Sequence, residues 1–270
     1  MIEQFFFIFV LMKDTNPIGL FDSGIGGTSI WKEVHALLPN ENTIYLADSI
    51  NAPYGLKSNE EIINLSCKNT EFLLNENCKI IVVACNTATT NAIKELRIKY
   101  DVPFIGIEPA IKPAAIQSKT HCIGILATKG TLNSTLFHKS VTNHPEVKII
   151  EQIGHGLVQL IENGDINSAE MTELLESYLL PMVEKNIDYL VLGCSHYPYL
   201  IPQIKKIIPS NIKIIDSGEA VAKQTKRILE ENNTLNYSID VATQIFYTNS
   251  EPTVLENILK NKEKVFYKIF

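Results

Sequence analysis

The sequence predicts an α/β protein that contains two similar units with mainly parallel sheets. Four apolar residues in a row, Ile80–Val83, indicate a strand that is buried on both faces, as the strands of parallel sheets are. This strand leads into Cys85 and then into a helical pattern. A second apolar run, Tyr189–Gly193, leads into Cys194 in the same way. Each unit therefore places one thiol in a strand-to-helix turn, where helix amides favour an anion such as a thiolate or a bound carboxylate.

An earlier strand and polar turn precede each cysteine at nearly the same distance, which indicates a duplicated unit. Gly19 lies in the first of these strands, and Gly124 lies in its counterpart. We therefore expect pseudo-twofold symmetry between the units and an active site in the cleft between them. Pro109 and Pro113 indicate a crossover from one unit to the other. The expected division is residues 12–108 with 219–270 for the first α/β domain and residues 109–218 for the second.

Short apolar runs predict the strands, and apolar residues at helical spacing predict the helices. In the first unit these patterns give a strand at 17–21, a helix from Ile30 to Leu38, a strand at 43–47, a turn at 51–57, a helix at 60–75, the strand and helix around Cys85, and a strand at 102–107. The second unit has the strand through Gly124, helices at 151–163 and 169–185, the strand before Cys194, and a strand at 212–215. A helix at 219–231, a polar surface linker at 231–238, and a strand and helix returning to the first unit within 243–270 complete the chain.

Composition excludes several classes of function. The net charge is −6 and the sequence has no basic block, which argues against nucleic acid or an anionic membrane as a partner. The five cysteines are an odd number and none forms a CxxC pair, so a disulfide framework is not expected. A reducing cytoplasm is the expected location.

The first residues need a separate interpretation. Residues 5–12, FFFIFVLM, are apolar throughout, but the run is far shorter than the roughly 20 residues that span a bilayer. No basic segment or small-residue cleavage site marks a signal peptide. We interpret residues 1–11 as an extension without a function, with the functional chain beginning at Met12.

A glycine-rich turn follows the first strand, at residues 22–29, DSGIGGTS. Such a turn points backbone N–H groups at an anionic ligand. A dinucleotide-binding fold is one alternative, with Asp48 in the place of a ribose-binding acid. The pattern lacks the third glycine and an acid precedes it, which favours another anion. Tyr54, in the turn after Asp48, offers a hydroxyl at the same edge, or else packs in the core.

Two thiols from two units suit one kind of chemistry. A thiolate on one side of a small substrate can remove a proton from carbon, and a thiol on the other side can return one, which inverts the carbon without a cofactor. The site must then stabilise carbanion charge with preorganised donors. We expect donors at two helix N-termini, residues 86–87 and 195–196, with Asn86 and Thr87 capping the first helix. Asp22 and His196 are the titratable neighbours that can tune the thiols.

Six motifs stand out along the chain: DSGIGG at 22–27, PYG at 53–55, ACNTAT at 84–89, IEPA at 107–110, ATKGT at 127–131 and LGCSHYPYL at 192–200. In this order and at this spacing they resemble the glutamate racemase family. The resemblance implies interconversion of L- and D-glutamate by two bases without a cofactor or a metal, which supplies D-glutamate for bacterial peptidoglycan. Cys85 would exchange the proton of D-glutamate, and Cys194 that of L-glutamate.

The resemblance also implies roles for neighbouring residues. The substrate-binding residues would be Asp22, Ser23, Tyr54, Gly55, Asn86, Thr87, Ser195 and His196, and the residues that assist proton transfer would be Asp22, His196 and Glu162. One departure is Ser195, where the family usually has threonine. Serine keeps the hydroxyl, so we expect its hydrogen bonds to persist in a slightly looser pocket. His196 favours glutamate over aspartate, because the related aspartate racemases usually carry glutamate at this position. Family members form dimers, so a homodimer is possible.

Other interpretations remain for the same residues. Cys85, Cys194 and His196 are the ligand types of a zinc site, although neither cysteine has the closely spaced thiol partner of structural zinc sites. A nucleotide-dependent oxidoreductase and a noncatalytic amino-acid sensor are the alternative functions. A pyridoxal phosphate enzyme would need a lysine, and Lys129 is the only one in the strand-end motifs. The other cysteines, Cys67, Cys78 and Cys122, are interpreted as packing thiols, and Glu162 alternatively as a solvated helix end.

Overall fold

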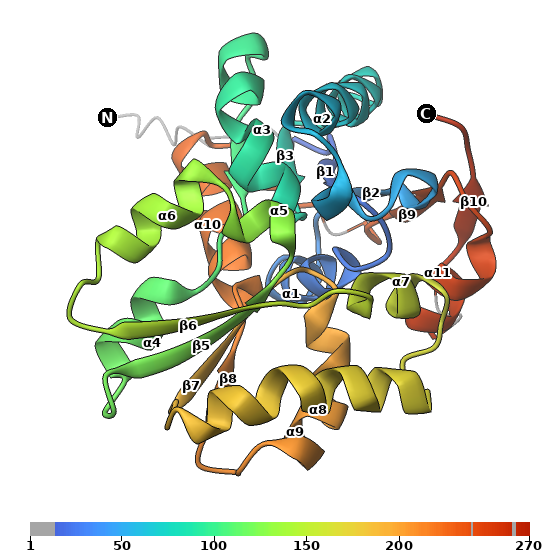
Figure 1. The fold of residues 1–270 in the computed structure, drawn as a ribbon. Helices are drawn as coiled ribbons and strands as arrows, with labels where there is room; N and C mark the ends of the chain where they lie inside the picture. Colours follow the sequence, from blue (N-terminus) through green and yellow to red (C-terminus); the bar gives the residue numbers. More distant parts are fainter. Residues whose placement is uncertain (1–13, 239, 261–262) are drawn as a thin grey trace, which may run out of the picture.

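The computed structural model describes residues 14–238, 240–260 and 263–270 of the 270-residue chain (Figure 1). The extension expected at residues 1–11 lies outside the described residues. The strands form two sheets, and every strand pair in both sheets is parallel. Helices surround the sheets, so the predicted α/β class with two mainly parallel sheets is confirmed.

The first sheet has six strands in the order β10-β9-β2-β1-β3-β4. All residues of β1, β2 and β3 are buried, as expected for central parallel strands covered on both faces. The predicted return of the last segment is confirmed, because β9 pairs with β2. The strands are β1 (Ile18–Asp22), β2 (Thr43–Ala47), β3 (Ile80–Val83), β4 (Phe104–Gly106), β9 (Gln244–Thr248) and β10 (Val265–Tyr267).

The second sheet has four strands in the order β6-β5-β7-β8. This order repeats that of β2-β1-β3-β4 in the first sheet, as the predicted duplication requires. Cys85 follows β3 and Cys194 follows β7, so the two thiols occupy equivalent places in the two series. The strands are β5 (Cys122–Ala127), β6 (Lys148–Ile153), β7 (Tyr189–Gly193) and β8 (Lys213–Ile215).

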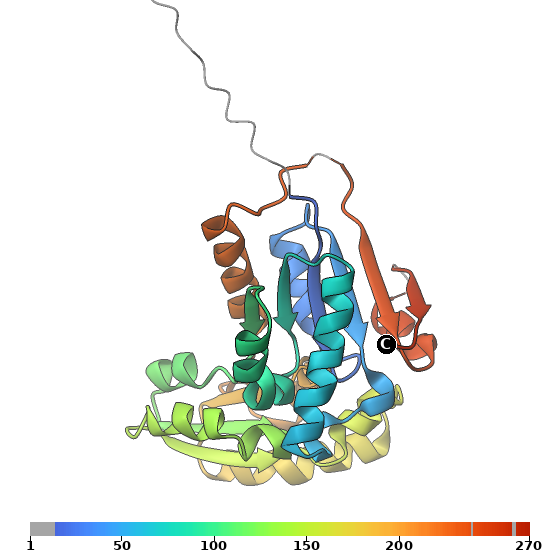
Figure 2. The same cartoon turned by 90° about the horizontal axis from the view of Figure 1, so that it is seen from above.

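Helices cover both faces of the first sheet. On β3, Ile80 and Val82 face the side where α1 and α10 pack together, whereas Ile81 and Val83 face α2 and α3 (Figure 2). The helices are α1 (Thr28–Leu37), α2 (Asn59–Asn75), α3 (Asn86–Lys99), α4 (Ile111–Gln117), α5 (Lys129–Leu132), α6 (Thr135–Thr142), α7 (Leu157–Glu162), α8 (Ala169–Glu184), α9 (Ile201–Ile207), α10 (Gly218–Glu231) and α11 (Pro252–Ile258). Three short 3₁₀ helices are η1 (Ser49–Asn51), η2 (Tyr54–Leu56) and η3 (Tyr197–Leu200). In the parts of the chain that are described, none of the helices combines the length and the apolar character needed to cross a bilayer.

Two expectations about local structure are wrong. The helix expected at residues 151–163 is instead the end of the edge strand β6, a turn, and α7, which begins at Leu157. Gly156 adopts a φ of 80° there, a left-handed conformation that interrupts a helix. The linker expected on the surface is only partly exposed, because Asn236 is buried and its N–H donates to Glu41.

Candidate active site

Cys85 lies at the junction of β3 and α3. Its backbone is extended, and it occupies the N-cap position itself, so the expectation that Asn86 and Thr87 cap the helix is wrong. The N–H of Ala88 donates to Sγ of Cys85 at 3.4 Å, and Oγ of Ser23 lies 3.6 Å from the same sulfur. Burial, and then the nearby charge of Asp22, raise the pKa of the Cys85 thiol well above its usual range. Cys85 therefore rests as a thiol that donates to Ser23 and accepts from Ala88, and both groups can donate to the sulfur once it is a thiolate.

Cys194 follows β7 and lies against an imidazole. Its Sγ is 3.8 Å from Nδ1 of His196, and both residues are buried. His196 occupies the N-cap position of η3, a short 3₁₀ helix, so the expected second helix N-terminus has only this short form. The partner of Cys194 is thus a side chain, whereas the partners of Cys85 are a backbone amide and a hydroxyl.

Asp22 lies between the two cysteine-bearing segments. The carboxylate ends β1 and is completely buried. It accepts from the N–H of Gly27 at 2.8 Å and from Oγ of Ser195 at 3.1 Å, and Nδ1 of His196 is 3.9 Å away. Burial raises the pKa of Asp22 above its usual value, although His196 and the Gly27 amide oppose this effect. Asp22 is therefore a carboxylate that can hold a proton more readily than an exposed aspartate.

Glu162, the last residue of α7, contacts the far side of the same imidazole. Its Oε1 lies 2.5 Å from Nε2 of His196 and accepts from the N–H of Ile25 at 2.7 Å. Burial lowers the pKa of His196, but the hydrogen bonds that the imidazole makes to Cys194 and Glu162 and the charges of Asp22 and Glu162 outweigh burial and raise the pKa well above the usual imidazole value. His196 therefore carries a proton between two acidic partners.

The hydroxyl of Tyr54 pairs with Asp48 and Asn69. The ring is buried, its hydroxyl donates to Oδ2 of Asp48, and Nδ2 of Asn69 donates to it at 3.1 Å. Asp48 also accepts from Asn249. The Tyr54 hydroxyl lies beside Asp48, directly after the carboxyl end of β2, and its hydrogen bonds to Asp48 and Asn69 fit the packing interpretation of this side chain.

Three threonines join the two units beside Cys85. Oγ1 of Thr87 on α3 lies 2.8 Å from Oγ1 of Thr128 and 3.4 Å from that of Thr131, both from the second unit. Asn86 is buried next to them, and among the described residues its Oδ1 has no hydrogen-bond partner. An unpaired buried acceptor in this place is costly unless a ligand donates to it.

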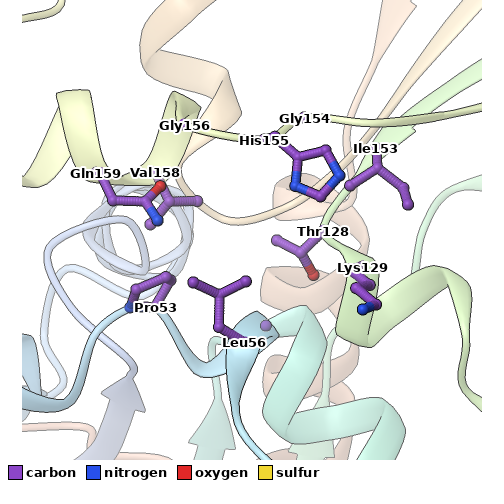
Figure 3. Close-up of a pocket in the computed structure, with 11 residues that line it drawn as sticks. Pro53, Leu56, Thr128, Lys129, Ile153, Gly154, His155, Gly156, Val158 and Gln159 are labelled. Carbon is purple, nitrogen blue, oxygen red and sulfur yellow. The ribbon is translucent and has the colours of Figure 1, made fainter.

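A pocket lies beside Thr128, the residue that contacts Thr87 (Figure 3). Residues of both units line it, including Pro53 and Leu56 from the first unit and Thr128, Lys129 and His155 from the second. Gly55, one of the predicted binding residues, also lines it. Cys85 and Cys194, only 4% and 6% exposed, lie deeper in the protein.

Most of the predicted site residues converge, but sequence reasoning missed others. The structure brings together Cys85, Cys194, Asp22, Ser23, Asn86, Thr87, Ser195, His196 and Glu162, whereas the Tyr54 hydroxyl pairs with Asp48 and Asn69. Thr128 and Thr131 were not predicted as site residues, and Asp48 was considered only as a ribose-binding acid. Thr128 and Thr131 stand in the polar turn after β5, equivalent to the turn after β1, and this symmetry is the signal that could have identified them.

The remaining cysteines lie outside this cluster. Cys122 and Cys78 are buried, and Cys67 is half-buried on α2. Sγ of Cys122 is 3.4 Å from the carbonyl of Lys185, at the start of β5, whereas Cys194 follows the opposite end of the neighbouring parallel strand β7. Within residues 14–238, 240–260 and 263–270, no group of three or more His, Cys, Asp or Glu side chains is arranged to hold a metal ion.

Comparison with known proteins gives a consistent family. The family model described as Asp/Glu/Hydantoin racemase matches residues 27–225. The glutamate racemase of Ralstonia pickettii is 44% identical over 241 residues, covering 89% of this chain and 85% of that protein. The glutamate racemase of Herpetosiphon aurantiacus is 41% identical over 89% of this chain and 95% of that protein.

Solved structures show the same likeness. A glutamate racemase isoform from Bacillus anthracis superposes with a TM-score of 0.85 at 30% identity, covering 95% of this chain and 98% of that one. The Escherichia coli glutamate racemase, in complex with L-glutamate and the activator UDP-MurNAc-Ala, gives a TM-score of 0.84 at 30% identity, covering 94% and 98%. The Francisella tularensis glutamate racemase, in complex with D-glutamate, gives 0.81 at 31% identity, covering 95% and 98%.

Proposed function

Because the chain belongs to the Asp/Glu/hydantoin racemase family as a glutamate racemase, we propose that it interconverts L- and D-glutamate with Cys85 and Cys194 as the two bases and without a cofactor. The observation that carries this mechanism is the position of Asp22. The carboxylate is next to Ser23 and Cys85 on one side, and contacts Ser195 and His196, which flank Cys194, on the other. Both thiols therefore share one buried polar centre.

The reaction needs one thiolate and one thiol in each turnover. With L-glutamate, the Cys194 thiolate takes the α-proton, and the electron pair of the broken C–H bond stays on carbon. The Cys85 thiol then gives its proton to the opposite face, which yields D-glutamate and a Cys85 thiolate. The reverse reaction exchanges the two roles, so protons and charge balance in both directions.

Neighbouring groups set the proton on each sulfur. His196 accepts the proton of the Cys194 thiol through Nδ1, and Glu162 holds the resulting imidazolium through Nε2. Asp22 accepts the proton of the Cys85 thiol, and its raised pKa suits this exchange. The Ala88 amide and Ser23 hydroxyl then stabilise the Cys85 thiolate.

Substrate binding uses the polar groups around the sulfurs. The free Oδ1 of Asn86, unpaired among the described residues, is an acceptor for the substrate ammonium. Ser23, Thr87 and Ser195 provide hydroxyls for its carboxylates, and Gly55 provides backbone at the mouth of the pocket. We place the path of the substrate through that pocket, past the Thr87–Thr128 contact. The two domains, residues 12–108 with 219–270 and residues 109–218, would separate to admit it.

The product suggests the biological role. D-glutamate is a component of bacterial peptidoglycan, so we place the enzyme in the cytoplasm as a supplier of this building block. The noncatalytic sensor is the second candidate, since a binding site of the same form would hold glutamate without exchanging its α-proton.

Exchange of the α-proton tests the mechanism. In D₂O without added cofactor, the enzyme should replace the α-proton of either enantiomer, followed by NMR, while circular dichroism follows racemisation. Cys85→Ala and Cys194→Ala should each abolish racemisation and keep the native far-UV spectrum, whereas Cys122→Ala, a buried thiol outside the site, should remain active. Racemisation by either site variant would contradict the two-base mechanism, and an absence of exchange by the wild type would favour the sensor.

A further inference from the structure

The first turn of α1 clamps the segment that carries Cys194 and His196. Oγ of Ser29 donates to the carbonyl of Ser195 at 2.8 Å, and Oγ1 of Thr28 lies 2.5 Å from the hydroxyl of Tyr199. The backbone nitrogen of Gly26, just before α1, lies 3.3 Å from Nε2 of His196. The first unit thus contacts this part of the second unit at three points, two of which are hydrogen bonds of α1 hydroxyls.

The hydrogen bonds of Tyr199 have one consistent direction. The single hydroxyl hydrogen of Thr28 is engaged by the carbonyl of Ile25 at 2.6 Å, so the Tyr199 hydroxyl must donate to Thr28. Nζ of Lys32 donates to the Tyr199 oxygen at 3.2 Å and lies 4.8 Å above the centre of its ring. The chain of donors therefore begins at a cation and ends at the Ile25 carbonyl.

Tyr199 and His196 are joined through η3. The N–H of Tyr199 donates to the carbonyl of His196 at 3.2 Å, and His196 is the N-cap residue of this short helix. By holding η3 against α1, the Tyr199 hydroxyl therefore fixes the backbone that carries the imidazole.

We propose that Tyr199, supported by Lys32 and Thr28, is a positioning residue that fixes the imidazole of His196 beside Cys194 during racemisation. This inference rests on the proposed two-cysteine mechanism. Tyr199 contacts no reacting atom itself, and its effect on the reaction passes through His196. The inference also gives Lys32 a purpose. Among the described residues, the only other hydrogen bond of its half-buried ammonium is to the carbonyl of Ile258 at the end of α11.

Tyr189 provides a matched control within the same chain. Nζ of Lys213 donates to its hydroxyl at 3.1 Å and lies 5.4 Å from its ring centre, but the pair stands at the opposite end of β7 from Cys194. Tyr189→Phe therefore removes an equivalent lysine-bonded hydroxyl without touching the clamp.

Isotope effects distinguish positioning from a general loss of structure. Since the equilibrium constant between enantiomers is unity, kcat/KM must fall equally in both directions in any variant. We expect Tyr199→Phe to lower it about tenfold, which corresponds to ~1.4 kcal/mol, the size of one hydrogen bond. In Tyr199→Phe, the proton transfer by Cys194 should become slower and therefore more rate-limiting. Since Cys194 abstracts the proton of L-glutamate, the deuterium isotope effect on kcat/KM should rise for [2-²H]-L-glutamate relative to that for [2-²H]-D-glutamate.

Further variants complete the test. Thr28→Val should raise the ratio of the L-glutamate to the D-glutamate isotope effect, as Tyr199→Phe does. Thr28→Ser, which keeps the hydroxyl, and Tyr189→Phe should both keep the wild-type ratio. An unchanged ratio in Tyr199→Phe, with or without a loss of rate, would overturn the positioning role. A wild-type enzyme that does not exchange the α-proton would instead overturn the proposed mechanism, so the two failures are distinguishable.

Discussion

His196 and Glu162 lie in different elements, η3 and α7, yet their Nε2 and Oε1 atoms are 2.5 Å apart. Glu162 is fixed in this position, since Oε1 accepts from the N–H of Ile25 and Oε2 accepts from Oγ of Ser49 at 2.9 Å. The first unit therefore orients the carboxylate that orients the imidazole. Through this contact Glu162 belongs to the same side of the site as Cys194. The alternative interpretation of Glu162 as a solvated helix end does not fit this position.

Replacing Glu162 with glutamine should weaken the Cys194 side of the reaction. The amide keeps the shape but removes the negative charge that favours the imidazolium, so the pKa of His196 should fall. We expect kcat to drop by roughly 10- to 100-fold, less than the roughly 10²- to 10⁴-fold effect of a group that transfers the proton itself. NMR titration of the imidazole and steady-state kinetics would measure the two effects.

A second glutamate–histidine pair offers the control. Oε1 of Glu146 lies 3.3 Å from Nδ1 of His144 on the surface. Glu146→Gln should leave both kcat and the His196 titration unchanged. Wild-type kcat in Glu162→Gln would remove Glu162 from the mechanism.

The stability of the fold should depend on pH through His196. The folded state raises the pKa of this imidazole above its ordinary value of 6.5. The stabilisation is therefore complete below pH 6.5 and is lost as the pH rises through the folded-state value. Within that window the free energy of unfolding should fall by at most ~1.4 kcal/mol per pH unit relative to His196→Gln, in which this titration is absent. Urea unfolding of both proteins across the pH range measures the difference, and parallel curves would contradict the raised pKa.

The sequence could predict elements whose signal is local. Ile80–Val83 and Tyr189–Gly193 are apolar throughout because helices cover both faces of the central strands, so both strands and the cysteines after them were identifiable. The edge strand β6 has no such signal. Its residues are half-buried or exposed, and with the apolar residues of α7 they mimic one amphipathic helix.

The sequence could not predict in which direction the side chains of the site point or which groups they contact. Tyr54 stands in a motif beside the site, but its hydroxyl pairs with Asp48 and with Asn69 from α2. Tyr199 and Lys32 lie far apart in the chain, and only the packing of α1 against η3 brings them together. Contacts of this kind depend on tertiary structure and leave no periodic pattern.

Tyr54→Phe should change stability much more than catalysis. Loss of the hydroxyl removes one donor from the buried Asp48 carboxylate and leaves Nδ2 of Asn69 without its acceptor, at a cost of about 1–3 kcal/mol. The KM for glutamate should stay within about twofold of the wild type. A hydroxyl that bonds Asp48 and Asn69 and does not contact the substrate contributes nothing to substrate binding. Thermal unfolding and kinetics would be compared with Tyr100→Phe, whose hydroxyl bonds the exposed Glu71. A large increase in KM would show that the Tyr54 hydroxyl contacts the substrate.

The buried ion pair of Lys79 and Glu41 should be essential to the first unit. Nζ of Lys79 lies 2.8 Å from Oε2 of Glu41, and the side chains are only 3% and 2% exposed. Lys79 also donates to the carbonyls of Asp14 and Thr234, and Glu41 accepts from the N–H of Asn236. The pair thereby ties the start of β3 to the segment that leads from α10 to β9.

Lys79→Met should lower the free energy of unfolding by roughly 3–5 kcal/mol, because it leaves the Glu41 carboxylate buried without its counter-ion. The double variant Lys79→Met/Glu41→Leu should be less destabilised than the sum of the single variants, since it removes both charges together. Urea unfolding of the four proteins completes the cycle. The surface pair of Lys99 and Glu71, with side chains about half exposed, is the control, and Lys99→Met should cost no more than about 1 kcal/mol. Additive effects of Lys79→Met and Glu41→Leu would mean that the two charges do not interact, contrary to their contact.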